Sequence, residues 1–64
     1  MKLLDLIIPS RRKKYKIALS HAKSKGLGRE FELSYGLFGN IEDALEDWDL
    51  LNDEYFKALE ENGF

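Results

Sequence analysis

Apolar side chains recur at helical spacing in the first half of the chain. Between residues 11 and 25 they follow the pattern i, i+3, i+4, i+7, which places them on one face of a helix: Tyr15, Ala18, Leu19 and Ala22. Ser10 precedes this segment, and its hydroxyl can accept a hydrogen bond from a free backbone amide as an N-cap. Glycines at positions 26 and 28 are typical of a helix C-terminus. The pattern predicts a helix over residues 11–25.

A second apolar segment covers residues 29–37 and continues to Phe38. Phe31, Ser34, Tyr35 and Phe38 keep a spacing of three and four residues, which favours a helix with these side chains on its inward face, but the alternation in FELSYGLF also fits a strand. A lone strand would have no partner in a ladder. We therefore expect a helix that Gly36 weakens and Gly39 ends.

The most regular apolar stripe follows Asn40, which can act as an N-cap. The stripe consists of Ile41, Ala44, Leu45, Trp48 and Leu51. Asn52 or Asp53 can cap a last helix, which Asn62 and Gly63 end. The apolar residues of this last helix are Tyr55, Phe56 and Leu59. One continuous, bent helix through Leu51 is an open alternative to two separate helices.

These segments predict an all-α fold, a small bundle of three to four short helices in a single domain over residues 1–64. The expected core consists of Tyr15, Leu19, Phe31, Tyr35, Ile41, Leu45, Trp48, Phe56 and Leu59. Residues 1–8, MKLLDLII, precede the helix breaker Pro9 and predict a short helix of their own. Their apolar side chains could complete the core, form a dimer seam or, with the basic residues after them, lie on a membrane surface.

Length and composition limit what can stabilise this fold. A chain of 64 residues buries only about 60% of its unfolded surface, so its core is marginal. It has no cysteine and one histidine, which excludes disulfides and makes a structural metal site unfavourable. Stability then comes from packing within one chain or from packing together with a partner. That partner can be a second copy of the chain, so a homo-oligomer is an open alternative. No apolar run reaches the roughly 18 residues of a membrane span, and we expect a cytoplasmic protein with no cofactor.

Charge is distributed very unevenly along the chain. Residues 1–29 carry nine of the ten Lys and Arg residues, whereas residues 30–64 carry eleven of the twelve acids. Cations crowd the start of the first predicted helix, where the positive end of the helix dipole disfavours them. Three explanations are open: a phosphate backbone, the chain's own acids at Glu60 and Glu61, or another protein. The candidate nucleic-acid-binding residues are Arg11, Arg12, Lys13, Lys14, Lys16 and Lys23.

The acidic residues gather mainly between positions 42 and 54. Helical spacing spreads them along one outer face, whereas a calcium site needs oxygen ligands that converge from a loop. The candidate protein-binding residues are Glu42, Asp43, Glu46, Asp47, Asp49 and Asp53. No serine stands in the sequence context of a nucleophile, and His21 lies at the edge of the first apolar stripe. We therefore expect no enzyme activity and no metal site.

The pattern Ala44-Leu45-x-x-Trp48-Asp49-Leu50 closes a stretch, residues 26–51, that resembles small helical proteins of bacteriophages and mobile elements. Some small acidic proteins of that kind inhibit host nucleases or polymerases by occupying their basic sites. The resemblance implies a regulatory or inhibitory protein–protein interaction. It assigns no activity to any residue.

The expected function is a non-enzymatic interaction or regulatory protein whose acidic face meets a basic protein surface. The alternative is nucleic-acid binding, in which the basic helix contacts phosphates without much sequence preference. For each charged face, the alternative to binding is that its side chains are solvated and have no partner.

Overall fold

The computed structural model describes residues 9–64, which form four α-helices and no strand. The helices are α2 (Pro9–Ser24), α3 (Gly28–Phe38), α4 (Ile41–Asp47) and α5 (Asp53–Glu61). The predicted fold class, an all-α bundle of three to four short helices, is confirmed. The predictions for residues 1–8 lie outside the described residues.

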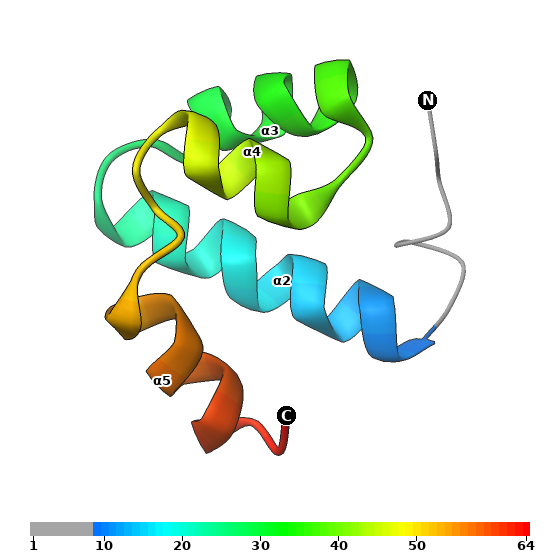
Figure 1. The fold of residues 1–64 in the computed structure, drawn as a ribbon, viewed down its shortest axis with the longest axis vertical. Coiled ribbons are helices and arrows are strands. Elements are labelled where there is room, and N and C mark those ends of the chain that lie inside the picture. The colour runs from blue at the N-terminus through cyan, green and yellow to red at the C-terminus, as the bar shows by residue number, and fades with distance from the viewer. Residues whose placement is uncertain (1–8) are drawn as a thin grey trace.

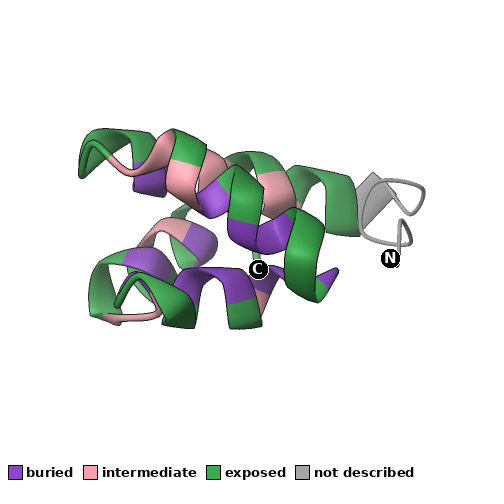
Figure 2. Ribbon diagram, turned by 90° about the horizontal axis from the view of Figure 1, so that it is seen from above, coloured by how far each residue is buried: buried purple, intermediate pink, exposed green. Residues whose placement is uncertain are grey.

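Helix α2 organises the bundle, because it packs against each of the other three helices. Figure 1 shows α3 and α4 together on one side of α2 and α5 on the other. Seen from above, the buried stretches of the helices face one another and the exposed stretches face outward (Figure 2). Ten of the twelve charged residues that the sequence predicts as binding sites are exposed, and the other two, Lys14 and Glu42, are half-buried.

Both ends of α2 differ slightly from the prediction. The helix begins at Pro9, so Ser10 lies in its first turn and is not the N-cap. Proline suits the first helical position, because its fixed φ is helical and the amide hydrogen that it lacks would have no partner inside the helix. At the other end Gly26 has a left-handed φ of 74°, and the Leu27 amide bonds the Ala22 carbonyl at 2.8 Å. This is a Schellman motif, which glycine favours.

Helix α4 is shorter than its apolar stripe predicts. It ends at Asp47, because Asp49 takes a left-handed φ of 58° and the Leu50 amide bonds the Leu45 carbonyl at 2.7 Å. The chain then turns before α5, where the side chain of Asn52 accepts a hydrogen bond from the Tyr55 amide at 3.3 Å. The alternative of one continuous helix through Leu51 is therefore wrong.

The core agrees with most of the predicted list. It contains the predicted Phe31, Tyr35, Ile41, Leu45 and Leu59, together with Ala18, Ala22, Ala44, Leu50 and Tyr55. Tyr15 and Leu19 are half-buried and pack against this core.

The predictions for Trp48 and Phe56 are wrong, because these side chains are 38% and 49% exposed. The left-handed turn at Asp49 breaks the register of α4, so Leu50 enters the core and Trp48 does not. On α5 the inward face consists of Tyr55 and Leu59, one turn apart, and Phe56 lies about 100° away from Tyr55 around the helix.

Candidate protein and nucleic-acid interfaces

Four of the six candidate protein-binding residues lie on α4. The side chain of Asn40 caps this helix by accepting a hydrogen bond from the Asp43 amide at 3.0 Å, as predicted. The cap places Glu42 and Asp43 in the first turn, where the helix dipole favours negative charge. Asp49 lies in the turn after α4, and Asp53 begins α5. The six acids therefore span two helices and the turn between them.

Glu42 faces the chain itself. Its carboxylate forms an ion pair with the Lys14 ammonium of α2, and the side chain is half-buried. Burial alone would raise the pKa of Glu42, but hydrogen bonds from Lys14 and the backbone, with the charges of Lys14 and Arg11, lower it below its usual value. Glu42 is thus engaged within the molecule.

Asp43, Glu46 and Asp47 remain on the outer face of α4. Together with the Phe38 side chain at the end of α3, they line a shallow groove of about 400 Å³. No ion pair with another part of residues 9–64 engages these three carboxylates. The groove therefore presents negative charge beside an aromatic ring.

A hydrogen-bond chain fixes one wall of this groove. The Trp48 indole N–H donates to the Ser34 hydroxyl at 2.7 Å, and that hydroxyl donates to Asp47 Oδ2 at 2.8 Å. Ser34 lies on α3 and is only 2% exposed. The chain ties α3 to the end of α4 and holds the Asp47 carboxylate in one orientation.

Large apolar side chains are exposed on α3 and directly after α4. Leu33 and Leu37 lie one turn apart on α3 and are 63% and 82% exposed, and Phe38 and Trp48 are also exposed. Large exposed apolar side chains that gather on one surface are typical of interaction sites. Sequence reasoning missed this feature, because it placed Trp48 and Phe38 on inward stripes.

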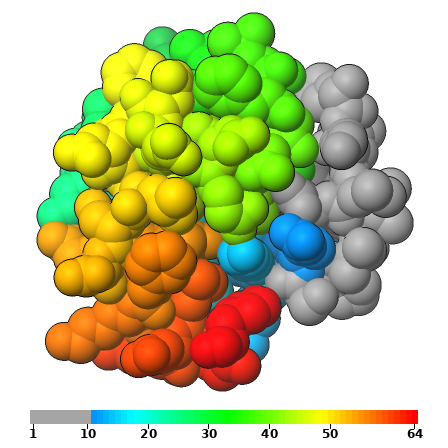
Figure 3. Space-filling model, viewed as in Figure 1, coloured from blue at the N-terminus to red at the C-terminus, as the bar shows by residue number. Residues whose placement is uncertain are grey.

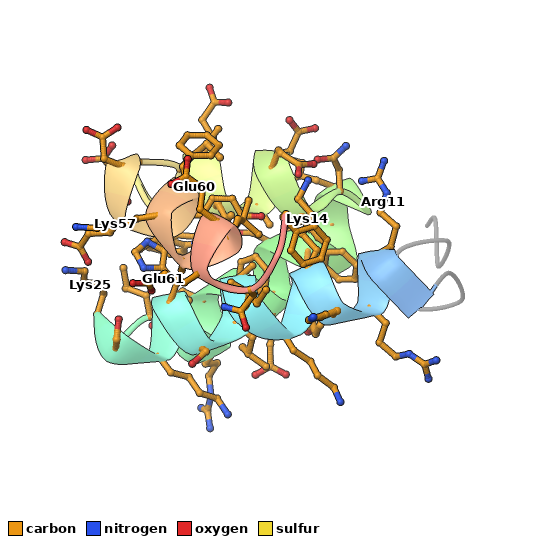
Figure 4. All side chains as sticks on the ribbon, turned by 90° about the horizontal axis from the view of Figure 1, so that it is seen from below. Arg11, Lys14, Lys25, Lys57, Glu60 and Glu61 are labelled. Carbon is orange, nitrogen blue, oxygen red and sulfur yellow. The ribbon has the colours of Figure 1, made fainter. Side chains whose placement is uncertain are left out.

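The candidate nucleic-acid-binding residues divide into two groups. The first group, Arg11, Lys13 and Lys14, interacts with other parts of the chain. Lys14 pairs with Glu42, and the charge of Arg11 lowers the pKa of the same carboxyl. The Lys13 ammonium lies 5.8 Å from the centre of the Phe64 ring. Figure 4 shows Arg11 and Lys14 at one end of α2 and Lys25 at the other.

The second group consists of Arg12, Lys16 and Lys23, which are exposed and form no ion pair within residues 9–64. Their spacing of i, i+4 and i+11 places them within about 40° of one another around α2. They form a single basic arc on the outer side of the helix. We call these three residues the basic arc.

Pairing of the basic helix start with Glu60 or Glu61, one of the three open explanations, is not formed as an ion pair in the described part of the chain. The acids that pair with α2 are Glu42 and Glu54, the latter with Lys25 at 2.9 Å. These pairs neutralise part of each charged half within the molecule. The basic arc and the outer acids of α4, Asp43, Glu46 and Asp47, form no ion pair within residues 9–64.

Residues 9–64 contain no group of three or more His, Asp or Glu side chains arranged to hold a metal ion. Within the same residues, every helix falls short of the length and apolar character that crossing a membrane requires. Comparison with protein-family models, curated protein sequences and solved structures finds no match to this chain.

Proposed function

We propose that this chain is a small, non-enzymatic interaction protein that binds a basic protein surface through the outer face of α4. The observation that carries the proposal is the groove that Asp43, Glu46 and Asp47 line together with Phe38. A partner's Lys or Arg side chain would meet carboxylates that form no ion pair within residues 9–64, and its aliphatic stem would lie against the aromatic ring. Asp49 and Asp53 extend the negative charge towards α5.

The exposed apolar residues beside the groove support a protein partner over a free cation. A stable interface needs an apolar centre as well as complementary charge. Leu37 and Phe38 on α3, and Trp48 directly after α4, supply exposed apolar area. By the resemblance described above, the proposed partner is a cytoplasmic enzyme or factor with a basic site for nucleic acid, and this chain would regulate it by occupying that site.

Charge reversal on α4 tests the proposal. A variant carrying Asp43→Lys and Glu46→Lys alters the groove without touching Glu42 or the hydrogen-bonded Asp47. Its matched control carries Glu32→Lys and Glu60→Lys, which change the net charge equally at exposed positions on α3 and α5. The measurement is affinity capture from a lysate of the source cell with wild type, variant and control.

We expect the wild type and the control to retain the same basic protein, and the groove variant to lose it. The retained protein should dissociate at high ionic strength, because exposed charge pairs are screened. Equal capture by all three forms would contradict the proposal.

The basic arc supports nucleic-acid binding as a second candidate function. Arg12, Lys16 and Lys23 span about 16 Å along α2 and are charged and exposed. If each neutralises one phosphate of duplex DNA, the log of the binding constant falls with the log of salt concentration at a slope of about −2.7. Fluorescence anisotropy with a labelled duplex measures this slope. Replacing the arc by glutamates should abolish binding, and retention would contradict this candidate.

A further inference from the structure

A second groove runs between α2 and α5, on different elements from the acidic face of α4. It has a volume of about 570 Å³, within the range of roughly 300–1,000 Å³ that small-molecule sites occupy. Its residues follow one face of each helix, at positions 13, 16, 17, 20, 21 and 24 of α2 and 54, 57, 58, 61 and 62 at α5. The groove is therefore elongated along both helix axes.

Contacts at both ends hold the two helices in an antiparallel arrangement. Lys25, just after α2, pairs with Glu54 in the first turn of α5 at 2.9 Å. At the opposite end the Lys13 ammonium lies over the ring of Phe64, beyond the end of α5. The C-terminal residues, in red, lie against the first half of α2 in the space-filling view (Figure 3). The groove between these two contacts is thus preformed.

Small side chains keep the middle of the groove open. Ser20 and Ser24 of α2 and Ala58 of α5 line it without filling it. Ile17 and Ala58, both half-buried, give it apolar surface. A hydrocarbon chain in the groove would contact Ile17 on α2 and Ala58 on α5.

The charges along the groove favour an anion. Lys13, Lys16 and Lys57 line it, against Glu54 and Glu61. Glu54 is already paired with Lys25, whereas no ion pair within residues 9–64 engages Lys16 or Lys57. Figure 4 shows the Lys57 and Lys25 side chains at the same end of the two helices. The apolar side chains of Ile17 and Ala58, with three lysines against two glutamates, complement a molecule that has an apolar body and one negative charge.

We propose that the α2–α5 groove binds a small amphipathic carboxylate, such as a free medium-chain fatty acid. Its hydrocarbon chain lies along Ile17, Ser20 and Ala58. Its carboxylate is attracted by the ammonium groups of Lys16 and Lys57, which line the groove from α2 and α5. This site is independent of the protein interface on α4.

Titration of the full, ¹⁵N-labelled chain with decanoate below its micelle concentration tests the proposal by NMR. We expect saturable shifts confined to the amides of residues 13–24 and 54–62. Decanol, which lacks the charge, should bind about tenfold more weakly or worse, because hydrogen bonds to a charged group are lost. Octanoate should bind more weakly than decanoate, by up to about fourfold for each buried methylene removed.

Two variants separate this site from general attraction to a basic surface. Lys16→Glu with Lys57→Glu should weaken decanoate binding about tenfold or more, whereas the charge-matched control, Lys23→Glu with Arg29→Glu outside the groove, should leave it unchanged. Ser20→Trp fills the groove from an exposed position and should block binding with every lysine retained.

Four results would overturn the proposal: equal affinity for decanol, equal losses in both charge variants, shifts centred on Leu33 and Leu37, or binding to anionic vesicles with none to monomeric decanoate.

Discussion

The imidazole of His21 on α2 donates a hydrogen bond from Nε2 to the backbone carbonyl of Leu50, at a distance of 3.0 Å. The two residues lie 29 positions apart in the sequence, and both are buried. Because a carbonyl can only accept, Nε2 carries the hydrogen. This bond ties the central helix to the turn that follows α4, and it explains why the one histidine of the chain lies inside the fold.

Replacing His21 should destabilise the fold strongly. In His21→Ala the Leu50 carbonyl loses its partner inside the protein, which costs about 1–3 kcal/mol, and the contact of the imidazole with the Tyr55 ring is lost as well. His21→Phe should restore much of the packing and leave the carbonyl unpaired. Urea denaturation followed by circular dichroism measures both variants. The exposed Lys23→Ala on the same helix should change stability by less than about 0.5 kcal/mol. Equal stability of all three proteins would show that the bond contributes nothing.

Replacing Asp49 by glycine should stabilise the protein. Asp49 holds a left-handed φ of 58° at the end of α4, a conformation that costs a side-chain-bearing residue about 1 kcal/mol, whereas glycine adopts it freely. Since glycine also raises the entropy of the unfolded chain, the net gain expected is about 0.5 kcal/mol. The control Glu46→Gly, inside α4, should destabilise by about 1 kcal/mol. Thermal unfolding should give shifts of opposite sign, and a decrease in both variants would contradict the prediction.

The ion pair between Lys14 and Glu42 should make stability fall in acid. The folded protein holds the pKa of Glu42 below the ordinary value of 4.5. The stabilisation is therefore present above that ordinary value, and it is lost as the pH falls through the lower pKa of the folded state. Urea midpoints between pH 6 and pH 3 should decline less steeply in Glu42→Gln than in the wild type.

Glu54, whose pKa is lowered by its hydrogen bond and charge contact with Lys25, contributes with the same sign. Because this carboxylate is exposed, added salt should remove its effect more readily than that of Glu42. An unchanged pH profile in Glu42→Gln would show that the pair does not couple protonation to folding.

The Ser34 hydroxyl should fix the positions of both the Trp48 indole and the Asp47 carboxylate. Ser34→Ala removes the acceptor of the indole N–H and the donor to Asp47, at an expected cost of about 1 kcal/mol. Released from α3, the indole should become more exposed, so its fluorescence should shift to longer wavelength and acrylamide should quench it more efficiently. The exposed Ser20→Ala is the matched control. A Trp48 spectrum that stays unchanged in Ser34→Ala would contradict the proposed chain of hydrogen bonds.

Local sequence signals predicted the starts of α4 and α5 well, although Ser10 is not the N-cap of α2. Asn40 and Asn52 act as N-caps, each accepting a hydrogen bond from the amide three residues later, and this signal depends only on neighbouring residues. The end of α4 could not be predicted in this way. The apolar spacing favours a helix through Leu51, but burial of Leu50 and the bond to His21 hold a left-handed turn there.

The candidate sites were predicted in part for a similar reason. Helical spacing placed Asp43, Glu46 and Asp47 on an outer face, and the structure agrees. The pairing of Glu42 with Lys14 depends on how α4 crosses α2, which no local pattern contains. Ser34 was placed on the inward stripe of its helix, and a hydroxyl among apolar residues could have indicated a polar partner such as Asp47. Whether these surfaces bind a partner stays a prediction.

Helix α5 packs mainly against α2. The Lys25–Glu54 ion pair and the contact of Lys13 with the Phe64 ring join the two helices at opposite ends. A helix that packs mainly on one neighbour can detach while the rest of the bundle persists. Amide protons of the last helix should then exchange with solvent faster than those of α3, and proteases should nick this C-terminal quarter first.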